Sequence, residues 1–127
     1  MDNTKHGSFS WNELTTSDPK AALEFYQKLF GWKTEVMNSN GFEYTVVKQG
    51  ERAVGGVMAL PREGCPVAWT SYVTVDDIDE TVKLAVSLGA IMHLPPMDIP
   101  NVGRFAIMGD PQGAVFAAIS YSLPQGT

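Results

Sequence analysis

Apolar side chains recur at intervals of three and four residues in two stretches of the chain. In the first stretch, residues 19–30, the apolar positions are Ala22, Phe25, Tyr26, Leu29 and Phe30. In the second, which ends before Gly89, they are Ile78, Val82, Ala85 and Val86. This spacing predicts two amphipathic helices, each burying one apolar stripe.

The residues that flank these stretches fit helix ends. Asp18 is a good N-cap and Pro19 suits the first helical position, while Gly31 can adopt the left-handed conformation that ends a helix. Asp76 or Asp77 caps the second helix. The first helix is therefore expected over about residues 19–30.

Short β-rich or alternating runs follow each predicted helix, and Gly, Asn and Asp punctuate them. The predicted strands are Lys33–Asn38, Gly41–Gln49, Ala53–Leu60, Ile91–Leu94, Gly103–Met108 and Ala114–Ser120. The predicted hairpin turns are Asn38–Gly41, Gln49–Glu51 and Asp110–Gly113. Residues 95–101, which contain three prolines, are expected to form a rigid loop.

The same order of features occurs twice. Trp11 precedes Asp18 by seven residues as Trp69 precedes Asp76, which sets the two halves at an offset of 58. Each half reads as a strand, a helix and three strands, so the chain is expected to be one domain (1–127) of two βαβββ modules, 8–60 and 67–121, joined by a linker at 61–66. Because about 58 residues make a poor core alone, the two sheets should pair with the helices outside, leaving a cleft lined by both.

Composition excludes several classes of function. The chain has 127 residues, 44% of them apolar, and a formal charge of −5, with no basic face to follow nucleic acid. It contains no apolar run of membrane-spanning length, and its first residues lack the apolar core of a secretory signal, so we expect a cytoplasmic protein without a membrane partner. Cys65 is the only cysteine, which excludes an internal disulfide.

Several local motifs together resemble the vicinal oxygen chelate superfamily, which includes glyoxalases, bleomycin-resistance proteins, fosfomycin-resistance enzymes and extradiol dioxygenases. They are Trp-Asn-Glu-Leu at 11–14, Asp-Pro…Phe-Tyr…Phe-Gly-Trp at 18–32, Val-Gly-Gly-Val-Met at 54–58, Val-Thr-Val-Asp-Asp-Ile-Asp at 73–79, Val-Gly-Arg at 102–104 and Asp-Pro-Gln-Gly at 110–113. The resemblance implies an α+β fold in which two paired βαβββ modules form a half-open barrel, often within a homodimer.

Enzymes of this superfamily usually hold a divalent cation with His and Glu side chains from four strands. The resemblance places the corresponding positions near Trp11, Met58 or Ala59, Thr70 and Ala117, none of which is such a ligand. Glu13 is the only carboxylate nearby, and His6 and His93 read as surface or boundary histidines. We therefore expect no metal and no other cofactor.

Glu13 is the candidate catalytic residue. It alternates with Trp11 on the first predicted strand, so the two side chains should share a face. On a cleft face, this carboxylate could accept a proton or bind a cationic ligand. The alternative is a structural carboxylate paired with Arg104 or another charge.

The other candidate ligand-binding residues each have a structural alternative. Thr70 and Tyr72 share a face of the fifth predicted strand and could extend an aromatic wall with Trp11, or pack in the core. Met58 follows two glycines that leave room for a ligand or for close strand packing. Arg104 could clamp an anion or pair with Asp98.

These residues support a small-molecule binding protein whose cleft, lined by Trp11, Glu13, Met58, Thr70, Tyr72 and Arg104, takes a hydrophobic or planar ligand without metal. The first alternative is a lyase, isomerase or dioxygenase-type enzyme that uses Glu13 or an unforeseen metal site. The second is a non-catalytic interaction domain.

Overall fold

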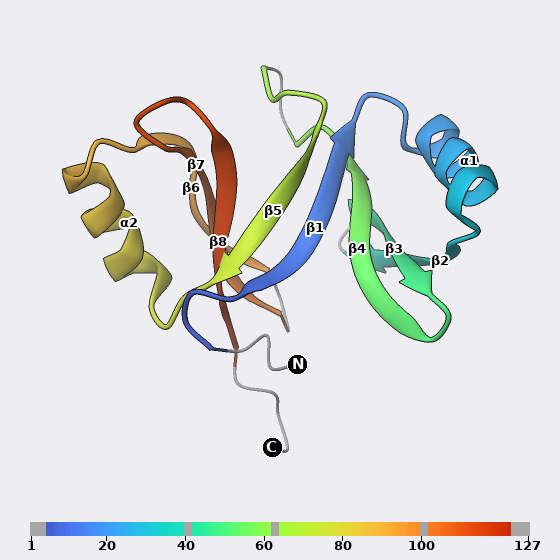
Figure 1. The fold of residues 1–127 in the computed structure, drawn as a ribbon, viewed down its shortest axis with the longest axis horizontal. Helices are drawn as coiled ribbons and strands as arrows, with labels where there is room; N and C mark the ends of the chain where they lie inside the picture. Colours follow the sequence, from blue (N-terminus) through green and yellow to red (C-terminus); the bar gives the residue numbers. More distant parts are fainter. Residues whose placement is uncertain (1–4, 40–41, 62–63, 100–101, 123–127) are drawn as a thin grey trace. The chain divides into compact units, whose positions relative to one another are not determined.

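The computed structural model describes residues 5–39, 42–61, 64–99 and 102–122. It contains two helices and eight strands in two successive β-α-β-β-β series (Figure 1). The first series is β1 (Phe9–Thr16), α1 (Pro19–Phe30), β2 (Lys33–Ser39), β3 (Phe42–Gln49) and β4 (Arg52–Ala59). The second is β5 (Ala68–Thr74), α2 (Ile78–Ser87), β6 (Ile91–Ile99), β7 (Gly103–Gly109) and β8 (Val115–Tyr121). The predicted α+β class with two βαβββ modules is confirmed.

The chain divides into two compact units. The first unit comprises residues 11–70, and the second comprises residues 71–127 together with 1–10. The N-terminal segment joins the second unit through backbone bonds: Gly7 N–H donates to the Thr74 carbonyl, and Thr74 N–H donates to that of Ser8. None of the helices in the described ranges is long and apolar enough to cross a membrane.

Within each unit, the first and last strands of the series are neighbours. The first unit has the strand order β2-β3-β4-β1, with β1 and β4 parallel. The second has the order β5-β8-β7-β6, with β5 and β8 parallel. The helix carries the chain from the first strand of each series to the edge strand, and the next three strands, which follow one another through short connections, pair antiparallel.

Both helices begin, and α1 ends, for the predicted reasons, whereas Leu88 rather than Gly89 caps the end of α2. The Asp18 carboxylate accepts a hydrogen bond from Ala21 N–H at 3.1 Å, and Gly31 ends α1 in the left-handed conformation at φ 75°. Asp77, rather than Asp76, caps α2 by accepting from Glu80 N–H at 3.2 Å.

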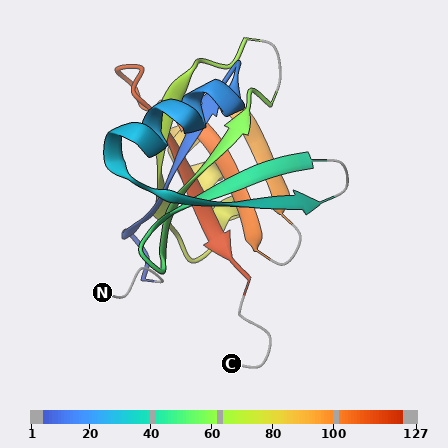
Figure 2. The same ribbon diagram turned by 90° about the vertical axis from the view of Figure 1, so that its right-hand side faces the viewer.

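The predicted buried stripes are partly wrong. In the first unit, Leu14, Val47 and Val57 form a core that Ala22, Leu23 and Tyr26 of α1 cover. Figure 2 shows α1 lying against one face of this unit's strands. Phe25, Leu29 and Phe30 remain 59%, 56% and 57% exposed. In the second unit, Ile78 is buried and Val82 and Ala85 pack around the core, but Val86 is exposed. Periodicity identifies an apolar surface, but the strand face that a helix covers decides how much of it is buried.

The predicted loop at residues 95–101 is also wrong over residues 95–99. Strand β6 continues through Pro95 and Pro96 to Ile99, and residues 100–101 lie outside the described part. Its register with β7 shifts between Leu94 and Met97, at the two prolines. A proline lacks the N–H that a ladder needs but is tolerated at a bulge on an edge strand. Parts of two other predicted connections, residues 40–41 and 62–63, also lie outside the described ranges.

Candidate functional site

A chain of hydrogen bonds links three side chains on the face of the first unit's sheet that points away from α1. The Trp11 indole Nε1–H donates to the Tyr44 hydroxyl at 2.8 Å. The Tyr44 hydroxyl donates to Glu13 Oε1 at 2.9 Å. We call these residues the Trp11–Tyr44–Glu13 chain; it confirms that Trp11 and Glu13 share a face.

The polarity of this chain follows from the chemistry of its members. An indole nitrogen can only donate, so the Tyr44 oxygen accepts that proton and directs its own toward Glu13. Glu13 Oε1 therefore accepts this hydrogen bond. In general, both oxygens of an ionised carboxylate act as acceptors. Glu13 is only 7% exposed, which makes a satisfied acceptor important for its stability.

Gly56 makes room for Tyr44. Glu13 lies opposite Gly56 in the parallel pairing of β1 with β4. A Cβ at Gly56 would overlap the ring and hydroxyl of Tyr44. The glycine therefore allows the tyrosine to lie across β4 and reach the carboxylate. Of the two alternatives for this pair of glycines, close packing is observed. At Gly55 the backbone of Asn12 on β1 takes the space of a Cβ, and at Gly56 the Tyr44 side chain takes it.

The remaining candidates in the first unit, Met58 and Thr70, are buried. Met58 lies opposite Thr15 on β1, two residues beyond Gly56, and is 8% exposed. Thr15 donates to the Pro66 carbonyl at 3.1 Å. Thr70 is also buried. Met58 thus shares the face of the Trp11–Tyr44–Glu13 chain.

Tyr72 and Arg104 belong to the second unit. The centroid of the buried Tyr72 ring lies 6.0 Å from the centroid of the Phe105 ring, in the tilted contact typical of core packing. Arg104 makes ion pairs with Asp79 and Asp98, each with an N–O distance of 3.1 Å. The hydrogen bonds that the guanidinium donates to Asp79, and next to Asp98, raise its pKa. The pairing with Asp98, which was the structural alternative for Arg104, is observed.

The residues at the positions implied for a metal ion do not fit one. Trp11 offers an indole, Met58 a thioether, Ala59 and Ala117 methyl groups, and Thr70 a hydroxyl, while Zn²⁺ and similar ions take imidazole, thiolate or carboxylate. In the described part of the chain, no three His, Cys, Asp or Glu side chains are grouped to hold a metal. His6 and His93 are both exposed, and His6 Nδ1 accepts from Asp76 N–H.

Tyr44 was not among the residues predicted to form the site. The alternating pattern of the third predicted strand indicates which face of the sheet Tyr44 lies on. It does not indicate that Tyr44 reaches β1, because that depends on how β3, β4 and β1 pair. One signal was present: a glycine within a strand often marks a place where another group approaches the backbone closely. Gly56 is such a glycine, but the sequence does not say which group approaches it.

Comparison with known proteins places the chain in a family. The family model described as Glyoxalase/Bleomycin resistance protein/Dioxygenase superfamily matches residues 8–117. "Putative glyoxylase CFP32" of Mycobacterium tuberculosis is 43% identical over 114 residues, which are 89% of this chain and 44% of that protein. The anthracycline biosynthesis protein DnrV of Streptomyces peucetius is 30% identical over 135 residues, covering 94% of this chain and 49% of that protein. The chain thus spans about half the length of these curated relatives.

Solved structures share the fold at low identity. A hypothetical protein of Bacillus halodurans superposes with a TM-score of 0.68 at 14% identity, covering 97% of this chain and all of that one. Methylmalonyl-CoA epimerase of Streptomyces coelicolor, in complex with 2-nitronate-propionyl-CoA, superposes with a TM-score of 0.64 at 13% identity, covering 93% of this chain and 99% of that one. From the family model and these relatives, the chain belongs to the glyoxalase/bleomycin resistance protein/dioxygenase superfamily.

Proposed function

We propose that this protein binds a small hydrophobic or planar molecule, without a metal ion, at the face that carries the Trp11–Tyr44–Glu13 chain. The observation that carries the proposal is the fixed polarity of this chain, because it holds a carboxylate as an acceptor beside an aromatic surface. Such a pair of groups suits a flat ligand with a positive charge or a strong hydrogen-bond donor.

Met58 would contribute apolar surface to the same ligand. Thr70 would add a hydroxyl to the same site. Tyr72 and Arg104 belong to the second unit and are candidate ligand-binding residues there, Tyr72 through its ring and Arg104, paired with Asp79 of α2, through its charge. Because two carboxylates already engage Arg104, we expect it to contribute less to ligand binding than Glu13.

Relatives and neighbours support a small-molecule ligand as a class. One relative is described as a protein of anthracycline biosynthesis, and a structural neighbour was solved with a coenzyme A derivative. Both descriptions fit a family that binds organic molecules. A planar cationic drug that the protein sequesters is one ligand of the proposed chemistry.

Calorimetry with the planar cation proflavine, in buffer containing EDTA, tests the proposal. We expect saturable binding to the wild-type chain and weakening of about tenfold or more in Glu13→Gln, since a hydrogen bond to a charged group contributes roughly 1.5–3 kcal/mol. Tyr44→Phe, which keeps the ring, should weaken binding less. Unchanged binding in Glu13→Gln would remove Glu13 from the site.

The same instrument tests the metal-free part of the proposal with Zn²⁺ and Ni²⁺ as titrants. We expect no stoichiometric tight binding of either ion. Tight binding of one ion per chain, lost in Glu13→Ala, would contradict the proposal and favour an unforeseen metal site.

The alternative is an enzyme of the lyase, isomerase or dioxygenase type in which Glu13 accepts a proton from the substrate. It is favoured by the burial of Glu13 and by its role as an acceptor. A turnover assay with α-oxo and 2-hydroxy acids separates the two functions. Turnover whose pH–rate profile loses one limb in Glu13→Gln would establish the enzyme.

A homodimer and a cytoplasmic location complete the proposal. Light scattering of the purified chain would give twice the monomer mass if the homodimer forms, and the monomer mass would contradict it.

A further inference from the structure

The opposite face of the same sheet carries a pocket that the proposed function does not use. It lies between α1 and strands β1, β3 and β4 of the first unit, with a volume of about 390 Å³. Its walls include Tyr26, Phe30, Trp32 and Trp69, and Val47 and Gly55 contribute to its lining. This volume falls in the lower part of the range for small-molecule sites, roughly 300–1,000 Å³.

The aromatic walls of the pocket are held in place by one another. The Trp32 ring lies 4.9 Å from that of Phe30, 5.9 Å from that of Tyr26 and 6.1 Å from that of Trp69, measured between centroids. The Trp69 indole N–H donates to the Tyr26 hydroxyl at 3.0 Å, which fixes the orientation of the indole. Trp69 nevertheless remains 38% exposed, so ring surface is open to a ligand.

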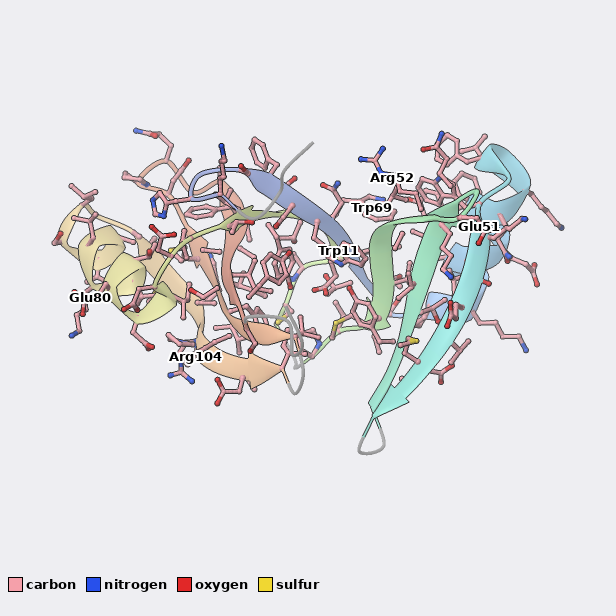
Figure 3. All side chains as sticks on the ribbon, turned by 90° about the horizontal axis from the view of Figure 1, so that it is seen from below. Trp11, Glu51, Arg52, Trp69, Glu80 and Arg104 are labelled. Atoms are coloured by element: carbon pink, nitrogen blue, oxygen red, sulfur yellow. The ribbon has the colours of Figure 1, made fainter. Side chains whose placement is uncertain are left out.

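A bulge in β4 orients the side chains at one side of this pocket. Val47 lies opposite Gly55 and Lys48 lies opposite Ala53, so Val54 is an extra residue without a partner on β3. Val54 packs against the core beneath α1 and lines the pocket. Arg52, two residues earlier on the strand, therefore belongs to the same face. Figure 3 shows Arg52 and Trp69 projecting toward the same edge of the first unit.

Arg52 supplies a positive charge that the described residues leave unpaired. It is exposed, and within the described ranges no carboxylate forms an ion pair with it. By contrast, Lys48 on the neighbouring strand pairs with Glu35 at 2.6 Å. An unpaired guanidinium that projects toward the same edge as the pocket residue Trp69 is complementary to a flat anion.

We propose that this pocket is a second ligand site, which binds an aromatic carboxylate with its ring against Trp69, Phe30 and Trp32 and its carboxylate toward Arg52. The site differs in charge preference from the Trp11–Tyr44–Glu13 face, which presents a carboxylate. Neither site needs the other to be occupied.

Fluorescence titration with 2-naphthoate tests this site, with the uncharged 2-naphthalenemethanol as a matched probe. We expect saturable binding of both, with 2-naphthoate the tighter. Arg52→Gln should weaken 2-naphthoate roughly three- to fivefold, the range for an exposed ion pair, and leave 2-naphthalenemethanol unchanged. Arg52→Lys should restore part of the loss. Lys83→Gln, which removes an exposed cation of α2 in the second unit, is the control and should change neither.

Two ring variants locate the bound probe. Trp69→Ala should abolish binding of both probes, and Phe30→Ala should weaken both while leaving the fold intact, because Phe30 is already 57% exposed. Absence of saturable binding to the wild-type chain would overturn the proposal. So would 2-naphthoate binding that is indifferent to Arg52→Gln and Phe30→Ala but lost in Glu13→Gln, since the probe would then occupy the opposite face.

Discussion

The two units have the same order of elements but differ in the face that points away from the helix. In the first unit this face carries a hydrogen-bonded indole, phenol and carboxylate over Gly56. In the second, the buried Tyr72 ring lies against Phe105 and opposite Ala117. The two units therefore share the order of their elements but differ in the side chains on this face. A metal site needs ligands from several strands, and the second unit supplies none at the positions compared.

The structure also corrects the offset between the repeats. Asp18 and Asp77 are the two N-caps, so the first strands and helix starts match at an offset of 59, not 58. Thr70 and Tyr72 then correspond to Trp11 and Glu13. Trp69 and Trp11 are therefore not equivalent positions. Trp69 contacts Tyr26 of α1, while Trp11 contacts Tyr44 on the other face of the sheet. A shift of one residue in a strand exchanges the two faces, so an identical residue at a constant offset can mislead.

Two buried methionines give the largest expected contrast between the units. Met108 is fully buried in the second unit's core, and Met108→Ala should lower the free energy of unfolding by about 2–5 kcal/mol. Met58 lies on the proposed ligand face, so Met58→Ala should cost less stability but weaken proflavine binding. Urea unfolding and calorimetry measure the two effects. Proflavine affinity unchanged in Met58→Ala would remove Met58 from the site.

Gly56 and Tyr44 give the next largest effect. Gly56→Ala places a methyl group where the Tyr44 ring lies and should lower the free energy of unfolding of the protein by about 1–3 kcal/mol. The same substitution in a Tyr44→Ala background should cost clearly less, because the clash is gone. A double-mutant cycle from urea unfolding measures this coupling. Equal costs in both backgrounds would show that the glycine does not serve the tyrosine.

Removing the Tyr121 hydrogen bond in the second unit should change the free energy of unfolding by less than Gly56→Ala does. Its hydroxyl donates to Ser10 Oγ at 2.8 Å, and Tyr121→Phe should cost about 0.5–1.5 kcal/mol. Burial raises the pKa of Tyr121 above its usual value of 10.0. Because the folded state holds this proton more tightly, the stabilisation is complete below pH 10 and is lost as the pH rises through the higher folded pKa. Urea unfolding between pH 9 and about 12 should show a decline that Tyr121→Phe reduces; an identical decline in both proteins would contradict this assignment.

Arg104 should give the smallest effect. Both of its ion pairs are at least one-third exposed, so water and salt screen them. Arg104→Gln should lower the urea midpoint slightly in dilute buffer and have no effect in about 1 M NaCl, where the screening length is roughly 3 Å. A decrease that persists at high salt would indicate a packing role.

Much of the fold could be predicted from the sequence because its signals are local. Asp18, Pro19 and Gly31 act within one turn of their own helix, and alternation located most strands. The exposure of Phe25 and Phe30 could not be predicted, since it depends on how much of the sheet α1 covers. The proposed site was predictable only in part for the same reason. Trp11 and Glu13 lie two residues apart on one strand, but Tyr44 reaches them only through the pairing of β1, β4 and β3.

The most direct test of the central claim is an NMR titration of the three tryptophan indole N–H signals with proflavine in the presence of EDTA. The proposed function predicts that the Trp11 signal shifts saturably, that Trp32 and Trp69 change little, and that Glu13→Gln removes the shift. Shifts confined to Trp32 and Trp69, or a Trp11 shift that appears only when Zn²⁺ replaces EDTA, would contradict a metal-free ligand site at the Trp11–Tyr44–Glu13 chain.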